Sequence, residues 1–125
     1  MAAEPPKNII WLPDVEEHDY PAAQSYLQLL HNDFRVAEMI KALRKAPIVQ
    51  FKAKDIFRAS GLSLLGVSNS HVERDRKKIK DGQGLAPLLL VRDEQIGRVV
   101  IADGYHRLCA VYTFDEDALI RCKIV

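Results

Sequence analysis

The stretch that decides the fold is Val99-Val100-Ile101-Ala102-Asp103-Gly104-Tyr105-His106-Arg107. It opens with four apolar residues, three of them β-branched, which is typical of a strand. Gly104 permits a sharp turn directly afterwards, because glycine adopts positive φ angles without a steric penalty. Leu108 and Val111 then stand at i and i+3, the spacing of one helix face. The sequence therefore predicts a strand over 99–102, a glycine turn, and a helix over 104–113.

The turn has the features of an anion-binding site. The first N–H groups of a helix lack intrahelical partners and lie at the positive end of the helix dipole. Gly104 lets a ligand approach the backbone closely, Arg107 offers two parallel donors to phosphate oxygens, and His106 titrates near neutral pH. We therefore expect a phosphate to bind at Gly104, His106 and Arg107. The alternative is that His106 and Arg107 make ordinary surface hydrogen bonds.

Asp103 stands at the end of the predicted strand, where three roles are open to it. A carboxylate there would cap the helix, hold a divalent cation beside a phosphate, or accept a proton. If the protein is an enzyme, we expect phosphoryl transfer or nucleotide hydrolysis. Arg107 would then stabilise phosphate charge, His106 would donate a hydrogen bond, and Asp103 would hold Mg²⁺ or act as the base.

A second positive element is the helix predicted over 70–81, which a Ser-x-x-Glu capping box opens and Gly82 ends. Val72 and Ile79 are its only apolar seam, and the other positions include Arg74, Arg76, Lys77, Lys78 and Lys80. Such a run is commonly a solvated helix face. The functional alternatives are that Arg74, Lys77 or Lys78 leans over the phosphate site, or that the helix contacts DNA phosphates.

Outside these elements, hydrophobic spacing and breaker residues indicate the rest of the fold. In order, we expect an arm over 1–18, a helix from Asp19, a helix capped by Asn32 or Asp33 and ended by Pro47, a strand over 48–51, helical turns over 54–60, a loop over 62–68, strands over 88–91 and 99–102, and a last strand over 118–125. In the first helix the spacing predicts a buried stripe of Ala22, Tyr26, Leu29 and Leu30. The leucines of 62–68 are expected to fill the core.

This order indicates a small mixed α/β (α+β) fold. We expect residues 1–47 to form an N-terminal arm and helical extension, and residues 48–125 to form the mixed unit, together one compact body. In the arm, the apolar run Ile9 to Leu12 is expected to cover a core edge, the alternative being a partner contact.

Composition narrows the function classes. A length of 125 residues suits one domain, and a net charge of +1 gives no global field to attract DNA or an acidic membrane. Cys109 and Cys122 are too few and too far apart for a disulfide framework or a zinc ribbon. No apolar signal region follows Met1–Lys7, and the longest apolar run is too short to span a bilayer. We expect a soluble cytoplasmic protein with no membrane partner and no metal cluster, His18 and its acidic neighbours being read as a solvated arm.

Over residues 48–125 the order of elements resembles the ParB/sulfiredoxin superfamily. The likeness rests on the basic helix, the segment Gly84 to Val91 that leads into an apolar strand, a short hairpin, the run Ile-Ala-Asp-Gly-Tyr-His-Arg-Leu-Cys-Ala from Ile101, and a closing strand. Members of that superfamily bind nucleotide phosphates at the corresponding turn, ATP in sulfiredoxins and CTP in ParB proteins. The resemblance implies a cradle of Gly104, His106 and Arg107, assisted by Ser70, Lys77 and Lys78, for ATP or CTP with Mg²⁺.

Two departures limit what the resemblance implies. Tyr105 stands where sulfiredoxins carry their catalytic cysteine, so reduction of sulfinic acids is not expected. The helix-turn-helix domain that follows this fold in ParB proteins has no counterpart before Val125, and no carboxylate cluster suits a two-metal nuclease. The leading hypothesis is a nucleotide- or phosphate-binding protein that hydrolyses or transfers a phosphoryl group if it is an enzyme. The alternatives are a non-catalytic DNA-associated module and a protein-interaction module, for instance a homodimer formed through the arm.

Overall fold

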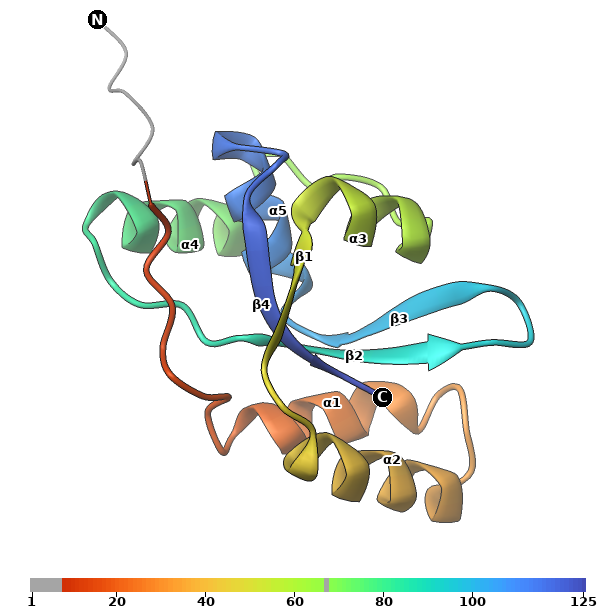
Figure 1. The fold of residues 1–125 in the computed structure, drawn as a ribbon. Coiled ribbons are helices and arrows are strands. Elements are labelled where there is room, and N and C mark those ends of the chain that lie inside the picture. Colours follow the sequence, from red (N-terminus) through yellow and green to blue (C-terminus); the bar gives the residue numbers. More distant parts are fainter. Residues whose placement is uncertain (1–7, 67) are drawn as a thin grey trace, which may run out of the picture.

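The computed structural model describes residues 8–66 and 68–125, so the expectations for residues 1–7 lie outside the described residues. Its elements are α1 (Asp19–Leu27), α2 (Asp33–Lys45), β1 (Val49–Lys52), α3 (Ala53–Ser60), α4 (Ser70–Lys80), β2 (Leu88–Asp93), β3 (Arg98–Asp103), α5 (Tyr105–Phe114) and β4 (Leu119–Ile124) (Figure 1). The predicted mixed α+β class is therefore confirmed. Across the described ranges, no helix combines the length and the apolar character needed to cross a membrane.

The four strands form one mixed sheet in the order β1-β4-β2-β3. β2 and β3 are an antiparallel hairpin, and Gly97 in its loop has a φ of +65°. β4 pairs with β2 in parallel and with β1 antiparallel. The end of β3 and the start of α5 therefore lie at one margin of the sheet, beside the central strand β2.

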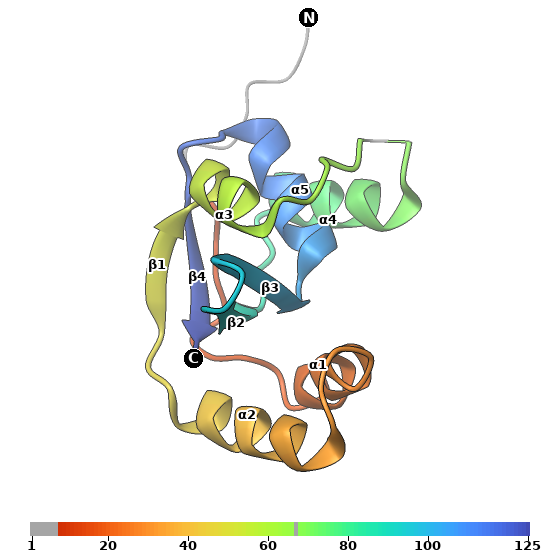
Figure 2. The same ribbon diagram turned by 90° about the vertical axis from the view of Figure 1, so that its right-hand side faces the viewer.

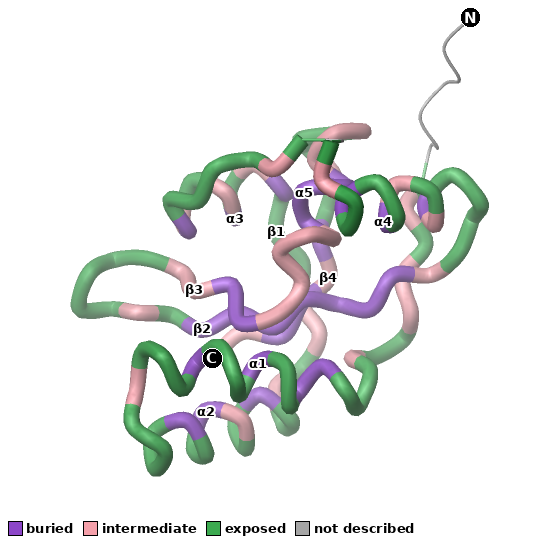
Figure 3. The backbone as a smooth tube through the Cα atoms, turned by 180° about the vertical axis from the view of Figure 1, so that it is seen from behind, coloured by how far each residue is buried: buried purple, intermediate pink, exposed green. Residues whose placement is uncertain are grey.

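Helices cover both faces of this sheet. α3, α4 and α5 lie on one side, and α1 and α2 lie on the other (Figures 1 and 2). Successive side chains of β2 point to alternate faces of the sheet. Leu88 and Leu90 belong to the core cluster under α5, whereas Leu89 and Val91 belong to the cluster under α1 and α2. Burial on both faces explains the unbroken apolar run of β2, which Figure 3 shows as a buried path between the helix layers.

The prediction for the buried face of α1 is wrong. The predicted stripe is exposed: Ala22, Tyr26, Leu29 and Leu30. The residues that α1 buries are Asp19, Tyr20, Ala23 and Leu27. Both sets fit helical spacing, but the helix ends at Leu27, so the two leucines that favoured the first set fall in the turn that follows. The face actually buried includes an acidic residue, Asp19, which spacing of apolar residues does not select.

Two further local predictions need correction. The cap of α4 is Asn69 rather than Ser70, because the Asn69 side chain accepts hydrogen bonds from the backbone N–H groups of His71 and Val72. In the loop after α3, Leu62 and Leu64 are exposed, and Leu65 packs against the core.

The N-terminal arm lies along the core edge, as predicted. Trp11 forms a parallel bridge with Leu85, and the backbone hydrogen bonds Leu12 N–Leu85 O (2.8 Å) and Leu85 N–Ile10 O (2.9 Å) hold it there. Ile9 and Trp11 pack against the cluster under α5. The arm therefore brings the start of α1 to the margin of the sheet where β3 ends.

Gly104 fixes the start of α5. It is the N-cap residue, with a φ of +103°, and a Cβ atom built on it would lie 2.6 Å from Leu88 Cγ. Both the positive φ and the close approach to β2 therefore favour glycine at this position. The contact places the first turn of α5 directly over the end of the central strand.

We predict that Gly104→Ala lowers the free energy of unfolding by about 2–4 kcal/mol, because positive φ strain and overlap with a buried leucine act together. The matched control is Gly97→Ala, where φ is also positive but a Cβ atom would meet nothing within 4 Å. Gly97→Ala should lower the free energy of unfolding only through the strain of the positive φ angle, by about 1–2 kcal/mol. Urea denaturation measures both, and equal losses would show that Leu88 does not constrain the turn.

Candidate functional site

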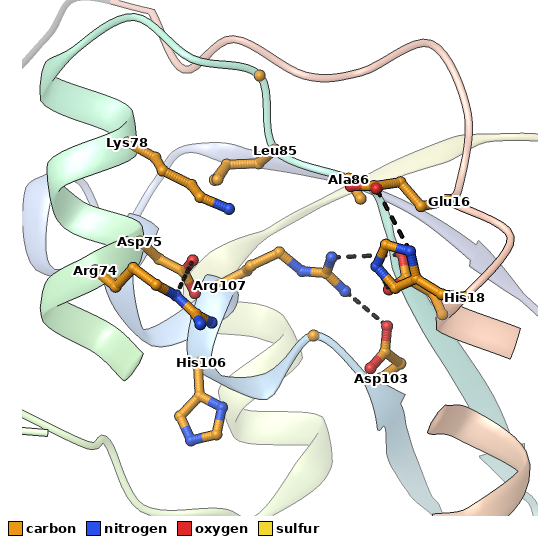
Figure 4. Close-up of a pocket in the computed structure, with 13 residues that line it drawn as sticks. Glu16, His18, Arg74, Asp75, Lys78, Leu85, Ala86, Asp103, His106 and Arg107 are labelled. Atoms are coloured by element: carbon orange, nitrogen blue, oxygen red, sulfur yellow. Dashed lines mark hydrogen bonds and ion pairs between the residues drawn. The ribbon is translucent and has the colours of Figure 1, made fainter. Parts of the chain in front are cut away.

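A cavity of about 230 Å³ lies where β3 ends and α5 begins (Figure 4). Three parts of the chain supply its charged walls. The segment entering α1 supplies Glu16, His18 and Asp19, α4 supplies Arg74, Asp75 and Lys78, and the strand–turn–helix unit supplies Asp103, Gly104, His106 and Arg107. The backbone over 84–86 closes the remaining side. Elements far apart in sequence thus converge on one polar site.

The cavity gathers six of the eight residues that the sequence nominates. Asp103, Gly104, His106, Arg107, Arg74 and Lys78 line it, whereas Ser70 and Lys77 do not. Both of the latter residues are exposed. The reason lies in helix geometry: Lys78 is four residues after Arg74 and shares its face, while Lys77 is turned by about 100°.

Arg107 is the centre of the site, but its charge is already partnered. Its side chain is only 14% exposed. Nη2 donates a hydrogen bond of 2.8 Å to Oδ2 of Asp103, and Nη1 lies 3.5 Å from Oδ2 of Asp19. Asp103 therefore binds the guanidinium and does not cap α5, whose N-cap is Gly104. We call these three residues the Asp19–Arg107–Asp103 cluster.

Burial and charge act on Asp103 in opposite directions. Burial is the main cause that raises the pKa of its carboxyl group; Arg107 lowers this pKa, the neighbouring Asp19 raises it, and the net value is about 6. Because the net shift is upward, burial and the second carboxylate outweigh the ion pair. Asp19 is itself 5% exposed, and its Oδ2 atom has no hydrogen-bond partner among residues 8–66 and 68–125.

α4 adds a buried acid and two cations. Asp75 is 3% exposed and stands between Val72 and Ile79 on the buried seam of the helix. Arg74 lies 4.0 Å from Asp75, and Lys78 projects into the cavity (Figure 4). Sequence reasoning missed Asp19 and Asp75 as site residues. The sequence did hold a signal: each of these acidic residues stands at a position where the helical spacing calls for a buried apolar residue.

His106 lies apart from the Asp19–Arg107–Asp103 cluster. Its side chain points away from Asp103, although it still lines the cavity (Figure 4). The imidazole packs against that of His71, with ring centroids 4.8 Å apart. Burial, followed by His71, lowers the pKa of His106. The imidazole is therefore neutral at pH 7 and would act as a hydrogen-bonding group rather than as a cation.

The residues present do not form a protein-only Mg²⁺ site. Within 8–66 and 68–125, no group of three or more His, Cys, Asp or Glu side chains is placed to hold a metal ion. The carboxylates of Asp19 and Asp103 both contact the guanidinium of Arg107. A magnesium ion would have to take most of its ligands from phosphate and water.

In comparisons with known proteins, no family model, no curated protein and no solved structure matches this chain. The chemistry of the cavity is therefore inferred from its own residues.

We predict that the carboxyl group of Asp103 titrates near pH 6 in ¹³C NMR spectra, and that Asp19→Asn lowers this pKa by removing a neighbouring negative charge. Because the folded pKa lies above the unfolded value, the free energy of unfolding should fall as pH rises from about 4 to about 6, by about 1–3 kcal/mol. Titration below pH 3.8, the ordinary value, would mean that the Arg107 ion pair outweighs burial.

Proposed function

We propose that the cavity binds the phosphate group of a nucleotide or of another phosphorylated small molecule. The observation that carries this proposal is the position of the α5 N-terminus, which opens on a cavity also lined by Arg74, Lys78 and Arg107. The N-cap residue, Gly104, has no side chain that could accept hydrogen bonds from the N–H groups of the first turn, so this usual competitor of an anion is missing at the N-cap. Oriented N–H groups and converging cations together favour a phosphate.

Lys78 is the cation most available to a ligand. Its side chain points into the cavity, and no carboxylate of the described residues lies within 4.0 Å of its ammonium group (Figure 4). Arg107, in contrast, is paired with two carboxylates, although its Nε atom has no hydrogen-bond partner. A phosphate would thus meet Lys78 and the N–H groups of α5 first.

The size of the cavity indicates which part of a ligand it takes. Sites that enclose drug-sized ligands measure about 300–1,000 Å³, whereas this cavity measures about 230 Å³. It suits one or two phosphate groups rather than a whole nucleotide. A bound nucleoside would lie outside the cavity, beyond its mouth.

The proposal includes kinship with the ParB/sulfiredoxin superfamily, with ATP or CTP as the expected nucleotides. The order of elements over residues 48–125 and the Asp-Gly-Tyr-His-Arg turn support it. If phosphoryl transfer takes place, Asp103 is the group best suited to accept a proton, because its pKa of about 6 is close to neutral pH. The DNA-associated alternative has less support, since Arg76 of the basic helix lies over the ring of Phe114.

We predict that Lys78→Ala weakens binding of pyrophosphate about tenfold, the loss typical of a charge-assisted hydrogen bond. Lys77→Ala is the matched control, since it removes the same charge from the adjacent position of α4 without touching the cavity. It should change the Kd less than twofold. Isothermal titration calorimetry of the full chain measures both, and a thermal-shift panel of ATP, CTP, GTP and ADP ranks the bases.

Equal effects of the two variants would mean that a diffuse field along α4, and not the cavity, attracts the anion. Absence of binding by pyrophosphate and by every nucleotide would contradict the proposed function itself.

A further inference from the structure

Asp19 reaches the phosphate site from an unexpected direction. It is the first residue of α1, a helix that packs on the other face of the sheet from α4 and α5. Its carboxylate is nevertheless buried against Arg107, and α1 is anchored there by Tyr20, Ala23 and Leu27. The N-terminal extension thus places a fixed negative charge inside a site that otherwise favours anions.

The charges that face Arg107 come from every element packed around it. The segment entering α1 presents Glu16, His18 and Asp19, β3 presents Asp103, α4 presents Arg74, Asp75 and Lys78, and α5 presents His106. The two groups in contact with the guanidinium are both carboxylates, Asp103 at 2.8 Å and Asp19 at 3.5 Å. A phosphate that has entered the cavity past Lys78 would therefore meet two buried negative charges at the Arg107 guanidinium.

Given the proposed function, on which this inference rests, we propose that the carboxylate of Asp19 competes with the phosphate ligand for the guanidinium of Arg107. The carboxylate holds one side of the Arg107 guanidinium until the Asp19 side chain turns aside. The site is thus self-inhibited at neutral and alkaline pH, and mild acid opens it.

The geometry makes Asp19 the releasable half of the cluster. Its contact with Arg107 is 3.5 Å and its Oδ2 atom has no hydrogen bond, whereas Asp103 makes a hydrogen bond of 2.8 Å. His18 is exposed, and its Nε2 atom lies 3.5 Å from Oδ1 of Asp19, so the imidazole is a second partner toward which Asp19 can turn. The raised pKa of Asp103, about 6, adds the acid dependence, because protonation of this carboxyl group removes the other negative charge in contact with Arg107.

The test compares pyrophosphate binding by the wild type, Asp19→Asn and Asp33→Asn at pH 8. Asparagine keeps the size of the side chain and removes its charge, so we expect Asp19→Asn to bind about tenfold tighter. Asp33→Asn is the matched control, because Asp33 is likewise the first residue of its helix but lies outside the cavity. It should bind like the wild type. Asp19→Ser, with a residue favoured at helix starts, should behave as Asp19→Asn does if the latter folds poorly.

Sulfate, whose charge is constant between pH 5.5 and pH 8, tests the acid dependence with the same proteins. Wild type should bind sulfate several-fold more tightly at pH 5.5, and Asp19→Asn should lose much of that difference. If the Asp19 variants bind pyrophosphate at pH 8 with the same affinity as wild type, or with lower affinity, Asp19 does not compete with the ligand and instead orients Arg107 for it. That result differs from failure of the proposed function, in which wild type and all variants bind neither anion at any pH.

Discussion

The close approach of Gly104 to Leu88 is the constraint on which the site depends. It lets the chain turn from β3 into α5 directly over the buried central strand, at a backbone angle that glycine tolerates best. The turn determines where the first N–H groups of α5 point and where Arg107, one helical turn later, emerges. The turn packs against β2, and β2 is buried on both faces, so the strand that contacts the turn contributes residues to both core clusters.

Around this turn the molecule joins its three layers through one ion cluster. Asp19 comes from a helix below the sheet, Asp103 from the sheet itself, and Arg107 from a helix above it. Buried ion pairs contribute little net stability, since desolvation offsets most of their attraction. Under the proposed function, the Asp19–Arg107–Asp103 cluster would exchange part of its internal ion pairing for the charge of the ligand.

Local signals were enough to predict much of this architecture. A β-branched run, a glycine and a helical repeat predicted β3, the turn and α5, and the same turn nominated Asp103, Gly104, His106 and Arg107, all of which line the cavity. The predictions that failed depend on tertiary structure. The predicted buried face of α1 was wrong because two sets of residues fit the spacing of one short helix. The burial of Asp19 depends on Arg107, which lies 88 residues further along the chain. Local signals also did not separate Lys78 from Lys77, because the rotation of α4 is set by packing against α5.

The most direct test of anion binding at the start of α5 is a pyrophosphate titration followed residue by residue in ¹H–¹⁵N NMR spectra. The account predicts saturable shifts that are largest at the backbone amides of Gly104, Tyr105, His106 and Arg107, because an anion would accept their hydrogen bonds. Saturable shifts centred on another surface, or no saturable shift at these four amides, would contradict it.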